Sequence, residues 1–164
     1  MTRFSQTLVL SLLVACAGAK PTAPMPVAPA PVAGLQIRHT SVFVDDQDKA
    51  LRFYTEVLGF TKKDDFSNGG YRWLTVAAPG ERTGTELQLA ANSMPAAKAL
   101  QEAAFAQSQP ALMFYTNDVK AEYERIKARG ATFTMPPTEV MAGSVIATLT
   151  DTCGNLIQIT QLAH

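Results

Sequence analysis

Hydrophobic and polar positions alternate along much of the chain and then change to a helical spacing, and this order of patterns occurs twice. In the first half, residues 35–44 carry apolar side chains at alternate positions and predict a strand. Residues 47–58 have apolar side chains three and four apart, which predicts a helix with one buried face. Asp45 or Asp46 is placed to cap its start, and Gly59 its end. Three more strands are expected at about residues 60–66, 71–78 and 85–91.

The second half repeats this order of elements. An alanine-rich helix expected at about residues 95–107 joins the halves, and a strand at 111–116 is followed by a helix through Arg129. The last three strands are expected at residues 132–135, 144–150 and 156–162. One sheet-plus-helix unit does not cover its own apolar sheet face, so two such units are expected to pair. The pattern predicts an α+β domain over residues 35–164, with modules at about 35–91 and 110–162.

The two halves match at an offset of 72 residues, with Asp46 corresponding to Asp118. At the same offset His39 corresponds to Ala111, and Glu86 corresponds to Gln158. Each pair is separated by 47 positions (86 − 39 and 158 − 111). Imidazole and carboxylate are good metal ligands, whereas a methyl group has no donor atom and a neutral amide is a weak donor. Only the first half therefore carries strong ligands at these positions.

The first 34 residues differ in composition from the rest of the chain. The apolar run Leu8–Ala15 is too short to span a bilayer, which takes about 20 residues, but it has the length of a signal-peptide core. The residues Leu-Val-Ala-Cys that end at Cys16 resemble the bacterial lipobox, in which the cysteine carries lipid. The alternative is an ordinary secretory signal that is cleaved after a later small residue such as Ala19.

A stretch rich in proline and alanine follows, with five of the ten prolines between positions 21 and 31. Such a composition favours an extended spacer. We therefore expect a lipoprotein signal peptide at residues 1–15 and a tether at 16–34. On this interpretation the domain is anchored by lipid to a membrane of the bacterial cell envelope and faces the periplasm or the exterior.

Charge and cysteine content narrow the function classes. The formal net charge is zero, which does not favour nucleic-acid binding, because that needs a concentrated positive field. If Cys16 carries lipid, Cys153 has no partner for an intramolecular disulfide. No histidine or basic residue adjoins Cys153 in the sequence to lower the pKa of its thiol, so we expect it to be inert.

Two segments resemble a known superfamily. Residues 53–60 read Phe-Tyr-Thr-Glu-Val-Leu-Gly-Phe, which is similar to the Phe-Tyr-x-x-x-Leu-Gly-Phe helix signature of the vicinal oxygen chelate superfamily. Residues 151–158 read Asp-Thr-Cys-Gly-Asn-Leu-Ile-Gln, which is similar to its Asp-Pro-x-Gly-Asn-x-x-Glu ending. That superfamily includes glyoxalase I, bleomycin-resistance proteins and extradiol dioxygenases. The resemblance covers about residues 35–162.

The resemblance implies two βαβββ modules whose sheets curl into a cupped, barrel-like structure. It also implies a divalent metal in the cup, bound from the first and last strand of each module. These positions are His39 and Glu86 in the first module, and Ala111 and Gln158 in the second. The resemblance therefore implies a degenerate site, with no confident cofactor or with a weakly held Zn, Ni, Mn or Fe ion.

Several candidate roles follow for the cup. A carboxylate bonded to one imidazole nitrogen raises the basicity of the other, so His39 and Glu86 can serve as a catalytic base or as a polar anchor. The residues expected to line the cup and bind a ligand are Trp73, Met113, Tyr115 and Gln158.

Three functions remain open: a metal-free small-molecule binder, an enzyme (lyase, isomerase or dioxygenase) that uses His39 and Glu86, and a non-catalytic envelope protein. The expected partners are a small-molecule ligand, a second copy of the chain in a homodimer, and the membrane through the lipid anchor.

Overall fold

The computed structural model describes residues 34–163. The chain divides between Gly34 and Leu35, and every described element belongs to the second unit. The expected signal peptide and tether, with Cys16, lie outside the described residues. Within residues 34–163 no helix is both long and apolar enough to cross a membrane.

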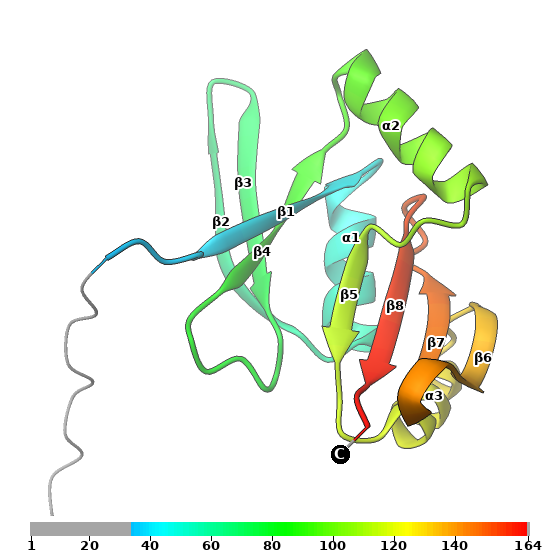
Figure 1. The fold of residues 1–164 in the computed structure, drawn as a ribbon. Helices are drawn as coiled ribbons and strands as arrows, with labels where there is room; N and C mark the ends of the chain where they lie inside the picture. Colours follow the sequence, from blue (N-terminus) through cyan, green and yellow to red (C-terminus); the bar gives the residue numbers. More distant parts are fainter. Residues whose placement is uncertain (1–33, 164) are drawn as a thin grey trace, which may run out of the picture. The chain divides into compact units, whose positions relative to one another are not determined.

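The N-terminal module forms a four-stranded sheet with one covering helix (Figure 1). Its elements are β1 (His39–Val44), α1 (Gln47–Arg52), the π-helical turn η1 (Phe53–Val57), β2 (Thr61–Asn68), β3 (Tyr71–Ala77) and β4 (Glu86–Ala91). The strand order is β1-β4-β3-β2. Strand β1 pairs with β4 in parallel, and the other pairs are antiparallel.

The C-terminal module has the same connectivity. Helix α2 (Pro95–Ala106) leads to β5 (Leu112–Tyr115), α3 (Val119–Ala128), β6 (Phe133–Glu139), the 3-10 turn η2 (Met141–Gly143), β7 (Val145–Thr150) and β8 (Leu156–Gln161). Its strand order is β5-β8-β7-β6, with β5 and β8 parallel. The prediction of an α+β fold made of two βαβββ modules is confirmed, and the sheets are cupped rather than closed into a barrel.

The helix caps follow from local sequence. The side chain of Asp46 accepts hydrogen bonds from the backbone of Asp48 and Lys49, both at 2.9 Å. Asp118 caps α3 in the same way. The helix predicted to run to Leu58 changes in its last turn, where the Leu58 amide donates to the Phe53 carbonyl five residues back at 3.2 Å. Gly59 ends it with a φ of +84°, a conformation that glycine adopts without strain.

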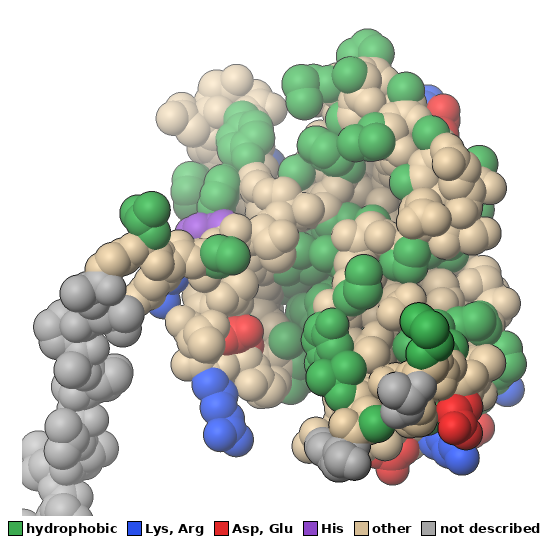
Figure 2. All heavy atoms as spheres, in the orientation of Figure 1, with side chains coloured by type: hydrophobic (Ala, Val, Ile, Leu, Met, Phe, Trp, Pro, Cys, Tyr) green, Lys and Arg blue, Asp and Glu red, His purple; other side chains and the backbone are tan. Residues whose placement is uncertain are grey.

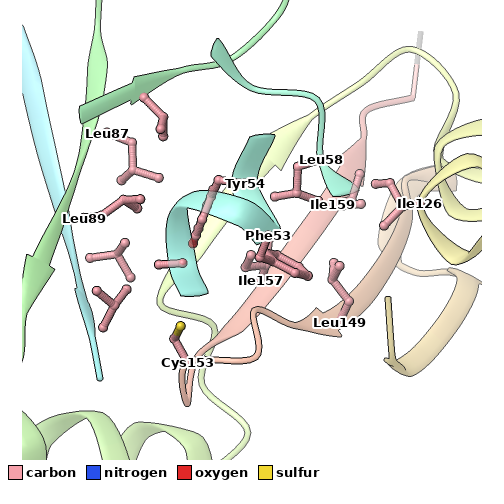
Figure 3. Close-up of a cluster of buried hydrophobic side chains, with 14 of the residues drawn as sticks. Phe53, Tyr54, Leu58, Leu87, Leu89, Ile126, Leu149, Cys153, Ile157 and Ile159 are labelled. Carbon is pink, nitrogen blue, oxygen red and sulfur yellow. The ribbon is translucent and has the colours of Figure 1, made fainter. Parts of the chain in front are cut away.

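One hydrophobic core serves both sheets. Figure 3 shows Tyr54 and Phe53 between Leu87 and Leu89 on one side and Ile157 on the other. Strand alternation gives each sheet an inner face in this core and an opposite face directed away from it. We call the second face of each sheet its open face.

A buried amide joins α2 to both modules. The Nε2 atom of Gln101 donates to the carbonyls of Phe43 and Cys153, both at 2.8 Å, and to Oδ1 of Asn155 at 3.0 Å. Asn155 in turn donates to the Phe43 carbonyl at 2.8 Å and to Asp151 at 2.6 Å. Burial raises the pKa of the Asp151 carboxyl. The turn between β7 and β8 is thus attached to β1 and to the linking helix.

Candidate functional site

The two metal-ligand candidates lie side by side on the open face of the N-terminal sheet. His39 on β1 is the register partner of Glu86 on β4. The Nε2 atom of His39 is 3.9 Å from Oε2 of Glu86, and the side chains are 44% and 22% exposed. The same Oε2 accepts a hydrogen bond from the Thr75 hydroxyl at 2.6 Å. Thr75 is held in turn by the backbone amide of Asp64 at 3.0 Å.

Trp73 connects this pair to an aromatic surface. Its ring makes an edge contact with the imidazole of His39 at a centroid distance of 5.3 Å. On its other side it stacks near Phe66, at 6.5 Å and an interplanar angle of 25°. Because Phe66 lies on β2 and His39 on β1, the indole extends across the sheet. In Figure 2 the histidine is exposed beside hydrophobic side chains. The structure therefore brings three predicted site residues together.

A second row of polar groups crosses the same face. The Ser41 hydroxyl donates to Oε1 of Gln88 at 2.7 Å. The Nε2 atom of Gln88 donates to the phenol oxygen of Tyr71. Gln88 is buried, whereas Tyr71 is 53% exposed. The row thus ends in a phenol that is open to solvent.

The other predicted ligand-binding residues lie on the C-terminal sheet. Met113 and Tyr115 are 57% and 66% exposed on its open face. Gln158 donates to the Thr160 hydroxyl at 3.0 Å and lies 3.9 Å from the sulfur of Met113. Both open faces point away from the shared core, so one chain does not bring these residues against His39, Glu86 and Trp73.

The strand register corrects one sequence correspondence. The offset of 72 makes Ala111 the counterpart of His39, opposite Gln158. In the structure the register partner of Gln158 is Met113. Ala111 precedes β5, and its amide donates to the Leu156 carbonyl at 2.9 Å. The offset therefore fails for strand pairing in the second module, and a thioether stands beside the glutamine.

The donor set does not fit a tightly held transition metal. Within residues 34–163 no three His, Cys, Asp or Glu side chains converge as metal ligands. His39 and Glu86 supply two donors, whereas two histidines and a carboxylate are a common minimum for non-haem iron. Gln158 lies on the other open face and offers only an amide oxygen. No chemical step is therefore assigned to a metal.

Two clefts flank the site without enclosing it. A cleft of about 910 Å³ follows the edge of β5 and includes Phe60, Met113 and Tyr115. The guanidiniums of Arg125 and Arg129 also line it, and they donate to backbone carbonyls at the end of η1. A cleft of about 310 Å³ lies beside Glu86 and includes Arg38 and Lys63. The larger cleft does not reach the His39–Glu86 pair.

Three polar residues of this face escaped the sequence analysis: Ser41, Thr75 and Gln88. Each lies two positions from a predicted site residue, which is the spacing that places side chains on the same face of a strand. Strand alternation counted from His39, Trp73 and Glu86 would have found them. Phe66 could not be found in this way, because β2 has a register irregularity between Lys62 and Asp65.

These features define a class of proteins in which two βαβββ modules form cupped sheets around a common core. Residues 36–159 match the family model described as the Glyoxalase/Bleomycin resistance protein/Dioxygenase superfamily. The chain belongs to this superfamily.

Individual relatives agree with the family. The chain is 51% identical over 127 residues to the uncharacterized protein YurT of Bacillus subtilis (strain 168), covering 77% of this chain and 99% of YurT. The crystal structure of UcmS2 superposes with a TM-score of 0.69 at 27% identity, covering 79% of this chain and 99% of UcmS2. TnmS3, an antibiotic binding protein from Streptomyces sp. CB03234, gives a TM-score of 0.63 at 29% identity, covering 80% and 99%.

Proposed function

We propose that this protein binds a small organic molecule with a flat ring system on the open face of the N-terminal sheet, and that binding needs no tightly held metal. The observation that carries the proposal is the indole of Trp73, which extends across the sheet between Phe66 and His39. Aromatic faces favour offset-stacked partners. Similarity to TnmS3, an antibiotic binding protein, supports this kind of ligand.

The open face is a better candidate than the larger cleft because its polar groups have free bonding capacity. In the cleft, Arg125 is engaged by Glu122 at 2.6 Å and by the Leu58 carbonyl at 3.1 Å. These contacts stabilise the end of η1. Binding sites typically combine an apolar surface with a few placed polar groups. Trp73 and the exposed phenol of Tyr71 provide this combination.

Acridone, a flat fluorescent tricycle, is a suitable first probe. We expect saturable binding by the intact protein and at least about tenfold weaker binding by Trp73→Ala, because stacking contributes about 1.5 kcal/mol. Phe105→Ala, which removes an exposed aromatic ring from α2, is the matched control and should bind normally. Equal binding by wild type and Trp73→Ala would exclude this face as the site.

A second candidate function is catalysis by His39 and Glu86, as a lyase, isomerase or dioxygenase with a weakly held Zn, Ni, Mn or Fe ion. The supporting observation is the pair itself, since a carboxylate near an imidazole can tune a general base. Glu86→Gln keeps the shape of the side chain and removes its charge. Turnover of a ligand that is lost in both His39→Ala and Glu86→Gln, with binding retained, would favour the enzyme over the binder.

We propose further that two copies of the chain complete the cup as a homodimer. Each chain exposes Met113 and Tyr115 on one open face and Trp73 on the other. Apposition of unlike open faces would place the predicted ligand-binding residues opposite one another. Met113→Lys should then lower the molar mass measured by light scattering and weaken acridone binding. Leu100→Lys, at another exposed apolar position, is the control. A monomeric wild type that binds acridone would contradict the shared cup.

Anchoring to the cell envelope is proposed from the first 34 residues alone. The lipobox-like residues before Cys16 support lipid attachment at that cysteine, and the proline-rich tether supports a domain held away from the membrane. Cys16→Ser should move the protein from the membrane fraction to the soluble fraction of bacterial cells. A variant that stays with the membranes would contradict lipidation at Cys16.

A further inference from the structure

The phenol of Tyr71 is oriented as a hydrogen-bond donor. Its oxygen already accepts a hydrogen bond from Nε2 of Gln88. The orientation of that amide is set by Ser41, whose hydroxyl donates to Oε1 of Gln88 at 2.7 Å. A phenol has a single proton, and with an N–H on the oxygen this proton points away from Gln88. Since Tyr71 is half exposed, the proton is available to a ligand.

The carboxylate of Glu86 is oriented as an acceptor. Oε2 receives the Thr75 hydroxyl at 2.6 Å, whereas Oε1 has no hydrogen-bond donor among residues 34–163. Arg38 and Lys63 line the same small cleft. Within the described residues, however, His39 is the one basic side chain within 4.0 Å of the carboxylate. An ionised carboxylate only accepts hydrogen bonds, so Oε1 remains free for an N–H or O–H group.

These two groups lie on either side of Trp73. Tyr71 precedes Trp73 by two residues on β3, and Thr75, which holds Glu86, follows it by two. Side chains at this spacing share one face of a strand. A flat molecule on the indole would therefore have one edge toward the phenol and another toward the carboxylate.

We infer that the ligand is a flat ring system with a hydrogen-bond acceptor, such as a carbonyl, on the edge that meets Tyr71, and an N–H or O–H donor on the edge that meets Glu86. This inference rests on the proposed function and adds the polarity of the ligand. Tyr71 and Glu86 determine specificity. Gln88 is a positioning residue, because it acts through the phenol of Tyr71.

Three tricycles of nearly equal size test this polarity. Acridone has a carbonyl and an N–H on opposite edges of its central ring. Xanthone keeps the carbonyl and replaces the N–H by an oxygen, and 9,10-dihydroacridine keeps the N–H and lacks the carbonyl. Affinities are measured by acridone fluorescence and by displacement of acridone. The wild type should prefer acridone to each of the other two by about tenfold, the worth of one good hydrogen bond.

Two variants should remove different preferences. In Glu86→Gln, whose amide can pair with the Thr75 hydroxyl instead of the ligand, the preference for acridone over xanthone should fall to about one, while the preference over 9,10-dihydroacridine remains. In Tyr71→Phe the opposite pattern is expected. Gln88→Leu, which keeps the phenol but removes the group that orients its proton, should reduce the same preference as Tyr71→Phe. Thermal melting checks that each variant is folded.

The outcomes separate this inference from the proposed function. Acridone binding that depends on Trp73, with no preference among the tricycles or with equal losses in both variants, overturns the polarity and leaves the proposed function standing. Failure of all three tricycles to bind overturns both. The crossed pattern supports both.

Discussion

His39 and Glu86 are opposite each other on adjacent parallel strands, yet their nearest nitrogen and oxygen atoms are 3.9 Å apart. This separation is longer than a hydrogen bond, which spans about 2.7–3.2 Å. The two side chains therefore do not satisfy each other, and both keep bonding capacity for a ligand. The pair lies at the position where related sheets are expected to carry a metal, but it is surrounded by hydroxyl, amide and aromatic groups.

Metal titration is the first prediction. With two protein donors, Zn, Ni, Mn and Fe(II) should each bind no more tightly than about micromolar, because a site completed mainly by water competes poorly for metal. Calorimetry on the purified protein measures this affinity, and His39→Ala is the comparison. Sub-micromolar binding that His39→Ala abolishes would contradict the metal-free account.

The second prediction concerns the amide that joins α2 to both modules. Gln101→Leu removes three hydrogen bonds to Phe43, Cys153 and Asn155 and leaves buried polar atoms without partners. The free energy of unfolding should fall by about 2 kcal/mol. Urea denaturation measures the change. Glu102→Gln, at an exposed position of the same helix, should have little effect, and equal stability of the two variants would contradict the role given to Gln101.

The third prediction is a pH dependence at the edge of the N-terminal sheet. Hydrogen bonding to the Arg72 guanidinium lowers the pKa of Asp65 from 3.8 to about 2. Because the folded-state pKa is depressed, the ion pair stabilises the fold above about pH 4, and this contribution is lost as the pH falls toward 2. After solvent screening the contribution is about 1 kcal/mol.

Asp65→Asn should therefore be less stable than the wild type near neutral pH and nearly equal to it at about pH 2. Urea denaturation at several pH values measures the difference. Asp64→Asn alters a neighbouring carboxylate whose side chain forms no ion pair with a described residue, and it should not show this pattern. A stability difference for Asp65→Asn that is constant with pH would contradict the ion-pair explanation.

The fourth prediction concerns Cys153. Burial, together with the nearby Asp45 carboxylate, raises the pKa of its thiol to about 12, and the residue is 2% exposed. In a Cys16→Ser chain at about pH 8, iodoacetamide should leave the folded protein unmodified and should alkylate it after unfolding in urea. Mass spectrometry measures the modification. Rapid labelling of the folded chain would show that the thiol is accessible.

Much of this fold follows from local signals. The caps at Asp46 and Asp118, the turn at Gly69 and the stop at Gly59 each depend on a few neighbouring residues, and the structure has them where they were expected. The start of β1 was less predictable. The apolar side chains of Leu35 and Ile37 suggest a strand, but they remain exposed and outside the sheet.

The pairing between strands could not be predicted in the same way. A constant offset between the halves assigns Ala111 to Gln158, whereas the register places Met113 there. Register depends on how a whole sheet packs on its helix, and a shift of two residues keeps every side chain on its face. The same limit applies to Thr75 and Glu86, whose contact joins two strands. Alternation predicts that they share a face but not that they are bonded.

The most direct test of the account uses the one tryptophan of the chain, Trp73. Its indole N–H gives a single resonance in a ¹H–¹⁵N correlation spectrum of the labelled protein. On addition of acridone, that resonance should shift saturably together with the amides of His39, Tyr71 and Gln88. Saturable shifts confined to Phe60, Arg125 and Arg129, with the indole resonance unmoved, would place the ligand in the cleft along β5 and contradict binding on the open face of the N-terminal sheet.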